Sequence, residues 1–281
     1  MKVARLIGLL GVLITVASAE TVTMDASADT CLWEFDPNHN FGAQTEIPAG
    51  TLAAGQGDKA RARALYKFDI ASLVPADAVI ISAQLRLTAV RMPPGASSST
   101  FALHRVLKKW AEGSKSGGMP GGSAATAGET TWNARLDGGS AWGEPGGAFG
   151  DDFSSGESAT VAVSGTRDYV INLNAQGRAD LQSMLTDPSE NHGWVFLTQS
   201  ESTAKTARRF GARERSSGAP ALTIEYEVPA PFTVPLESTR FESAGNNVVL
   251  RVTAVPGAAY ELQRAEVGTP NTWVTVAAKE G

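Results

Sequence analysis

The chain has 281 residues, and its 24 Lys and Arg stand against 29 Asp and Glu, which gives a net charge of −5 at pH 7. This acidic balance argues against nucleic acid as the main partner, because domains that bind nucleic acids are usually strongly basic. A single cysteine, Cys31, excludes an intramolecular disulfide. We expect Cys31 to be a small buried apolar side chain, with a reactive thiol as the alternative.

The first 19 residues have the pattern of a secretory signal peptide. Lys2 and Arg5 precede the short apolar run 6–16, and Ala17-Ser18-Ala19 provides small residues for cleavage. The apolar run is too short to span a bilayer. We therefore expect a secreted protein, extracellular or held at the cell surface, whose mature chain is soluble and begins at Glu20.

Strand patterns dominate most of the chain. Apolar and polar residues alternate over 81–90 and 222–226, which is typical of strands with one buried face, while Trp194–Leu197 is apolar on both faces. One helix is expected between Asn174, a good N-cap, and Pro188, which ends it. These patterns predict an all-β sandwich of residues 20–228 with one short helix.

Glycine- and proline-rich segments divide the rest. Residues 113–128 and 137–156 are long loops, a feature that is often functional, with tolerated surface insertions as the alternative. Residues 229–238 are expected to form a stiff, proline-rich linker. Residues 239–281 then predict a small, incomplete β module of four short strands, namely Thr239–Ser243, Val248–Ala254, Tyr260–Arg264 and Trp273–Ala277.

Positive charge is concentrated in two short segments. Residues 59–67 and 205–215 together hold nine of the 24 Lys and Arg. Alternate residues of a strand point to the same face of a sheet. If 61–70 and 207–215 are strands, the outer faces carry two sets of basic side chains: Arg61, Arg63 and Lys67 on the first strand, and Arg209, Arg213 and Arg215 on the second.

Residues from about 23 to 227 resemble the DNRLRE-type module of bacterial secreted proteins, which is grouped with carbohydrate-binding module family 96. The matching segments occur in order: Ala28-Asp29-Thr30, Asn40-Phe41-Gly42, 63–73, 81–87, Trp110-Ala-Glu-Gly113, Thr130-Thr-Trp-Asn133, Trp142, Gly146-Gly147, Asn191-His-Gly-Trp194, Arg213-Glu214 and 221–226. This resemblance implies a jelly-roll β-sandwich without enzymatic activity. Some members of the family bind acidic polysaccharides such as alginate. The segment 255–264, followed by Trp273, is similar to fibronectin-like accessory modules.

The basic strands suggest how such a ligand would be held. If the two strands are neighbours, their arginines and lysine line a cationic groove, and guanidinium groups can hold a carboxylate or sulfate through two parallel hydrogen bonds. The alternative is that these cations pair with acids of the same domain, each exposed pair contributing roughly 0–1 kcal/mol. The acids considered are Asp58, Asp69, Glu201 and Glu214.

Tryptophans offer a second means of sugar binding, because an indole ring matches the apolar face of a pyranose. Aromatic side chains more often serve core burial. Trp194 lies in an apolar run and is expected in the core, and Trp110 and Trp132 are weaker candidates for a ligand. Trp142 lies in a Gly-rich loop and is the best candidate for an exposed ring.

Oxygen donors near the mature N-terminus suggest a structural calcium ion. Asp29, Asp36, Asn38 and Asn40 lie close together in the sequence, and calcium takes six to eight hard oxygen ligands. The spacing is not that of an EF-hand, and Asx turns are the alternative. Asp151-Asp152 is a second, less favoured candidate.

No catalytic constellation competes with these binding hypotheses. The three histidines, His39, His104 and His192, lie far apart in the sequence, without a zinc pair on a helix or a Gly-x-Ser-x-Gly elbow. Tyr169 with Arg167 is the remaining candidate for a lyase pair. The sequence therefore predicts a non-catalytic, secreted module that binds an acidic polysaccharide, with a purely structural or adhesive module of a larger bacterial surface protein as the alternative.

Overall fold

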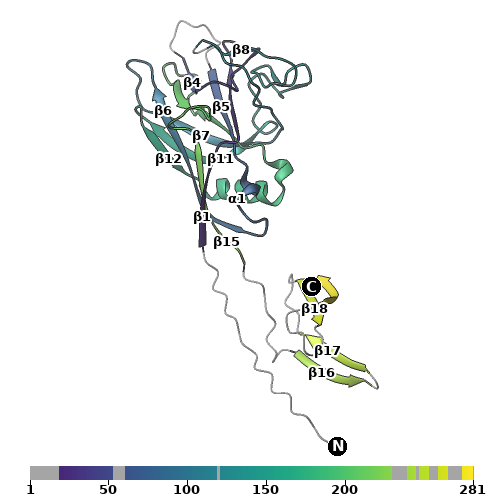
Figure 1. Ribbon diagram of the computed structural model, residues 1–281. Coiled ribbons are helices and arrows are strands. Elements are labelled where there is room, and N and C mark those ends of the chain that lie inside the picture. Colours follow the sequence, from purple (N-terminus) through teal and green to yellow (C-terminus); the bar gives the residue numbers. More distant parts are fainter. Residues whose placement is uncertain are drawn as a thin grey trace, which may run out of the picture. The chain divides into compact units, whose positions relative to one another are not determined.

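The computed structural model describes residues 19–52, 61–118 and 121–229, together with the backbone of four strands in residues 239–280 (Figure 1). Contacts separate the chain into a main unit, Val16–Pro229, and a smaller unit that contains Ala230–Gly281. The predicted signal peptide up to residue 18, Asp58 and residues 230–238 of the predicted linker lie outside the described residues.

The main unit is built on one large antiparallel sheet that curls on itself. Its hydrogen-bonded path runs β1-β15-β6-β14-β4-β5-β13-β7-β11, with β12 added beside β6 and β2 beside β5. The strand bounds are β1 Ala19–Asp25, β2 Ala28–Trp33, β4 Glu46–Thr51, β5 Arg61–Lys67, β6 Val79–Arg91, β7 Ser99–Val106, β11 Phe153–Val163, β12 Asp168–Asn172, β13 Trp194–Thr198, β14 Arg208–Gly211 and β15 Ala221–Glu227.

Strand β4 joins the two halves of this sheet. Residues 46–49 pair with β14, whereas Gly50 and Thr51 pair with β5. The two halves enclose the main core, to which Phe101 and Phe196 contribute from one half and Leu222 from the other. The predicted all-β, sandwich-like fold is confirmed, as are the strands expected at 81–90, 194–197 and 222–226.

A single α-helix closes part of this core. Helix α1 spans Ala175–Thr186, and the side chain of Asn174 accepts a hydrogen bond from the backbone N–H of Gly177. Its buried side is formed by Leu181, Met184 and Leu185, as the sequence predicted. Two short 3-10 helices, Ile70–Ser72 and Pro188–Glu190, complete the helical content of the main unit's described residues. In the part of the chain that the structure describes, no helix is long and apolar enough to cross a membrane.

A second, smaller core covers the outer face of β5 and β13. Leu65 and Val195 from these strands pack with Trp110, Trp132 and Trp142 from the segment between β7 and β11. This segment contains the short strands β8 (Ser123–Ala124), β9 (Ala134–Leu136) and β10 (Ser140–Ala141), and β8 pairs with β3 (His39–Asn40). The long loops predicted here therefore form a packed layer, and the second ends earlier than predicted, because β11 begins at Phe153.

Cys31 is the small buried side chain that the sequence predicted. The side chain is fully buried in the main core, and its thiol donates to the carbonyl oxygen of Pro48 at 3.3 Å. Burial raises the pKa of this thiol well above its ordinary value. A buried, protonated thiol is a poor nucleophile.

In the described residues of the smaller unit, four strands form two antiparallel pairs. β16 (Thr239–Ala244) pairs with β17 (Asn247–Val252), and β18 (Ala259–Arg264) pairs with β19 (Val274–Glu280). The four strands predicted for this part of the chain are present with small shifts at their ends.

Candidate functional site

Arg61, the first of the predicted ligand-binding residues, is paired within the domain. Its Nε and Nη2 donate to the two carboxylate oxygens of Glu34 at 3.0 and 2.7 Å. The guanidinium carbon also lies 5.1 Å from the centroid of the Trp132 ring, a cation–π contact. The charge of Arg61 is therefore matched by a two-point salt bridge inside the main unit.

Arg63 is buried beneath the layer that covers β5, with 4% of its surface exposed. Its Nε and Nη2 donate to Oε1 and Oε2 of Glu201 at 2.8 and 2.7 Å. Nη1 donates to the carbonyl oxygens of Gly146 and Gly147, both at 2.8 Å. This arginine fastens the covering layer to the sheet, and each of its three nitrogens already has a partner.

Lys67 ends β5 and is half-buried. No salt bridge to its side chain is found among the described residues. Strand β4 lies between β5 and β14, so the two basic strands are not direct neighbours. The six basic residues that were predicted to bind the ligand therefore lie at several different places on the main unit.

Three arginines gather around a single carboxylate, that of Glu46 at the start of β4. Nε of Arg91 lies 3.2 Å from Glu46 Oε2, Nη1 of Arg209 lies 3.7 Å from the same oxygen, and Nη1 of Arg215 lies 3.1 Å from Oε1. Arg209 and Arg91 are also paired across β14 and β6. We call these four residues the arginine cluster. Three cations share one anion there, which leaves an excess of positive charge.

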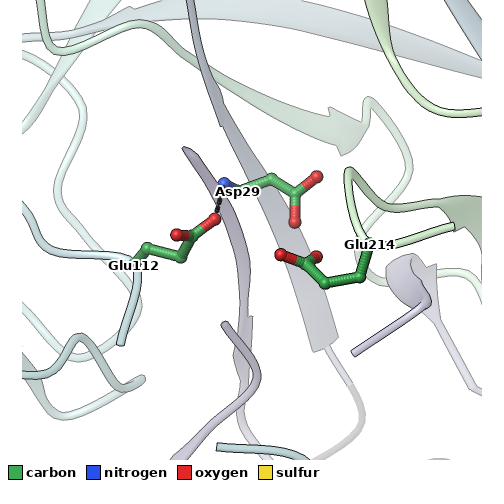
Figure 2. Close-up of side chains that lie close together, drawn as sticks. All are labelled: Asp29, Glu112 and Glu214. Atoms are coloured by element: carbon green, nitrogen blue, oxygen red, sulfur yellow. Dashed lines mark hydrogen bonds between the residues drawn. The ribbon is translucent and has the colours of Figure 1, made fainter. Parts of the chain in front are cut away.

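Arg213 belongs to a different group. Its Nε lies 2.6 Å from Glu112 Oε1 and 3.1 Å from Glu214 Oε1, and its backbone N–H donates to Oδ2 of Asp29 at 2.7 Å. The backbone N–H of Asp29 in turn donates to Glu112 Oε1 at 2.8 Å. Asp29, Glu112 and Glu214 bring one carboxylate oxygen each within 4.8 Å of the others (Figure 2). We call these three residues the carboxylate cluster.

The carboxylate cluster is electrostatically strained. Burial raises the pKa of Asp29 well above its ordinary value, and the nearby charges of Glu214 and Glu112 raise it further, against a hydrogen bond from Arg213. Burial also raises the pKa of Glu214, with Glu112 adding to the rise. The pKa of the fully buried Tyr66 hydroxyl is raised by burial and then by the charge of Asp29. Anions are gathered here with too little compensating charge.

The second basic strand is shorter than the sequence predicted. β14 ends at Gly211, and residues 213–214 form a turn in which the N–H of Arg215 donates to the carbonyl oxygen of Ala212. Phe210 and Ala212 are fully buried, as the alternation predicted. The expected continuous row of three outward arginines is wrong, because the turn sends Arg213 to the carboxylate cluster and Arg215 to Glu46.

Trp142 does not offer an exposed ring. Only 5% of the residue is exposed, and its Nε1 donates to the carbonyl oxygen of Thr131 at 2.9 Å. Its ring centroid lies 5.7 Å from that of Phe153 in the second core. The expected exposure is wrong, because the Gly-rich segment folds onto the sheet and its aromatic side chain supplies the apolar contact.

Asn40, one of the residues predicted to bind calcium, has its side-chain amide fully hydrogen-bonded. Nδ2 donates to the carbonyl oxygens of Glu112 and Thr130 at 2.7 and 2.9 Å, and Oδ1 accepts from the N–H groups of Gly42 and Lys115 at 3.0 and 3.2 Å. Two donated and two accepted bonds exhaust what an amide side chain can make. Asn40 therefore connects the chain around Gly42 with two segments of the covering layer.

The other predicted calcium ligands have different partners. The side-chain oxygen of Asn38 accepts from Asn133 at 2.8 Å, and the backbone carbonyl of Asp36 accepts from His39 at 2.9 Å. Of the two predicted aspartates, Asp29 is the one that joins a group of at least three potential metal-binding side chains in the described residues. Its companions are Glu112 and Glu214 instead of Asp36.

Sequence reasoning missed Glu46 and Arg91 in the arginine cluster and Glu112 in the carboxylate cluster. A usable signal existed for the second cluster. Its members lie in three of the segments that carry the family resemblance: Ala28-Asp29-Thr30, Trp110-Ala-Glu-Gly113 and Arg213-Glu214. Each of these short segments has a carboxylate, and the fold brings the three carboxylates together.

Comparison with known proteins does not assign the chain to a family. No protein-family model matches the chain, and no curated protein is significantly similar to it.

Proposed function

We propose that this chain is a secreted, non-catalytic β-sandwich module that holds an acidic polysaccharide at the arginine cluster. The observation that carries this proposal is that Arg91, Arg209 and Arg215 share the single carboxylate of Glu46. Three guanidinium groups and one carboxylate leave two positive charges. The resemblance of the sequence to modules that bind alginate supports the same class of ligand.

The geometry supports this ligand class through the donors that remain. Arg91 is the most accessible member, with 67% of its side chain exposed, and it meets Glu46 through Nε. Among the described residues, its two terminal nitrogens have no carboxylate partner and remain as donors. Arg215 meets Glu46 through Nη1 and the carbonyl oxygen of Ser217 through Nε. The remaining N–H groups suit the carboxylate of a uronic acid or a sulfate group. Several weak contacts along one polymer add up through multivalency.

A second function is supported by the other cations. Arg61, Arg63 and Arg213 are each bound to carboxylates of the same unit, and Arg63 fixes the layer that covers β5. This is the pairing expected of a purely structural or adhesive module of a larger surface protein. The two functions differ in whether the arginine cluster binds an external anion.

Affinity electrophoresis in a gel that contains alginate tests the proposal. We expect the native protein to be retarded at low salt and to be released as salt rises, because exposed charges are screened by salt. The double variant Arg91→Gln/Arg215→Gln should bind at least about tenfold more weakly, since it lacks two charge-assisted contacts. Arg178→Gln, a substitution of the same kind on helix α1, is the matched control and should bind like the native protein.

Two results would overturn the proposal. Unchanged mobility of the native protein at low salt would leave the structural function. Equal weakening by Arg178→Gln would show that binding depends on overall charge and not on the arginine cluster.

A further inference from the structure

The three members of the carboxylate cluster come from segments far apart in the sequence. Asp29 is on β2, Glu112 follows β7 in the covering layer, and Glu214 is in the turn after β14. Figure 2 shows the carboxylates of Asp29 and Glu214 facing each other, while that of Glu112 approaches the backbone amide of Asp29. The three side chains converge from different directions on a small volume.

The charges in this volume do not balance. Arg213 is the cation that forms salt bridges to the cluster among the described residues, and it does so with both Glu112 and Glu214. When all three carboxylates are ionised, as they must be to bind a cation, one guanidinium leaves two negative charges. Like charges this close repel strongly where water is largely excluded.

Independent support for a bound cation comes from oxygen atoms that lack partners among the described residues. Asp29 is 0% exposed, and while Oδ2 accepts from the N–H of Arg213, Oδ1 is buried and has no hydrogen-bond partner in this part of the chain. Within the same described residues, Oε2 of Glu214 is likewise buried without a partner. A buried polar oxygen left unsatisfied is costly, and native structures rarely leave one without a hydrogen-bond partner or a bound ion.

The chemistry of the donors selects the ligand. All three side chains offer carboxylate oxygens, which hard cations prefer, and the cluster includes neither the thiolate nor the imidazole that zinc commonly takes. Calcium accepts irregular geometry with six to eight oxygens, some of them from water, and its two positive charges equal the local excess of negative charge. We propose that Asp29, Glu112 and Glu214 form a calcium-binding site that ties β2, the covering layer and the turn after β14 together.

This site differs from the one predicted from the sequence, since it shares Asp29 but replaces Asp36, Asn38 and Asn40 with two glutamates. It shares no side chain with the arginine cluster, although Glu214 and Arg215 are consecutive residues. The calcium test measures Tm and Ca²⁺ binding and the polysaccharide test measures gel mobility, so failure of one proposal can be distinguished from failure of the other.

Thermal unfolding with EDTA or with CaCl2, combined with calorimetric titration of Ca²⁺ into the metal-free protein, tests the site. We expect saturating Ca²⁺ to raise the Tm by about 5 °C, because a ligand that binds the folded state alone stabilises it. Glu214→Gln, at a partly exposed side chain that should tolerate the change, and the isosteric Asp29→Asn should both reduce the Tm shift and weaken binding at least about tenfold. Asp36→Asn is the matched control and should bind Ca²⁺ like the native protein.

Three outcomes would reject the site. The first is a native protein whose Tm is the same in EDTA and in CaCl2. The second is undiminished Ca²⁺ binding in Glu214→Gln, which also decides the matter if Asp29→Asn fails to fold. The third is a loss of binding in Asp36→Asn, which would place calcium in the cluster predicted from the sequence.

Discussion

Arg63 and Glu201 are 138 residues apart in the sequence and form a salt bridge in which two guanidinium N–H groups meet both carboxylate oxygens. Arg63 lies on β5 and Glu201 follows β13, so the pair spans two adjacent strands of the sheet. The same guanidinium also holds two carbonyl oxygens of the covering layer. A residue that the sequence presents as surface charge is thus part of the interior.

Replacing Arg63 should destabilise the main unit. Arg63→Gln leaves Glu201 without its partner and two carbonyl oxygens without their donor, so we expect the free energy of unfolding to fall by about 3 kcal/mol. The double variant Arg63→Gln/Glu201→Gln should lose less, because no charge is left unpaired. Chemical denaturation measures both, with Arg178→Gln as a control expected to change stability by less than about 0.5 kcal/mol. Equal stability of Arg63→Gln and the native protein would contradict the structural role.

Trp142→Ala should unfold the covering layer or weaken it severely. Removing a buried tryptophan from the second core costs about 3–5 kcal/mol, because the cavity collapses only in part. Equilibrium denaturation followed by tryptophan fluorescence gives the loss. If Trp142→Ala instead kept its stability and lost alginate binding, the ring would act as a sugar platform after all.

Gly193 permits the start of β13 to approach β5. Its φ is +70°, and a Cβ at this position would clash with the carbonyl oxygen of Tyr66. Gly193→Ala should therefore cost at least roughly 1–3 kcal/mol, since both the backbone conformation and the contact become unfavourable. Gly165→Ala, where no atom lies within 4 Å of the added Cβ, is the control. Similar melting temperatures for the two variants would argue against this close approach.

His104 should make stability depend on pH. Burial lowers the pKa of this histidine on β7, whose Nδ1 lies 3.0 Å from the carbonyl oxygen of Ser154. The unfolded chain, with a histidine pKa of about 6.5, binds a proton more readily than the folded protein does. The stability that neutral His104 contributes is present above that pH and is lost as the pH falls towards the lower folded pKa. Unfolding free energies of the native protein and of His104→Gln, measured over this range, should diverge at neutral pH and converge in acid.

The sequence was most informative where buried residues recur at regular intervals along a strand or a helix. Alternation over 81–90 predicted β6, and Asn174 with Pro188 predicted α1, because one buried face sets each pattern. β4 escaped this reasoning, since Pro48 lacks a backbone donor and argues against a strand. In the structure Pro48 pairs with Arg209 at the junction of the two halves, where the strand changes its partner.

The side-chain pairings could not be predicted in the same way. Whether Arg213 meets Glu112, 101 residues away, depends on the register of several strands and on the turn that follows β14. The segment around Trp142 was also ambiguous, because a glycine-rich sequence does not by itself show whether a loop is exposed or packed onto the sheet. The sequence showed that basic residues are concentrated in two segments. The carboxylates with which they pair are determined by the tertiary structure.

The pairing of β1 with β15 determines how the main unit would respond to force. The two strands are antiparallel, with Glu20, the expected first residue of the mature chain, opposite Tyr226, so both ends of the unit lie at one corner (Figure 1). A load applied between these two residues would peel the strands apart, breaking the hydrogen bonds of the ladder one after another instead of shearing them together. Pulled by its two ends, the unit would therefore yield at low tension.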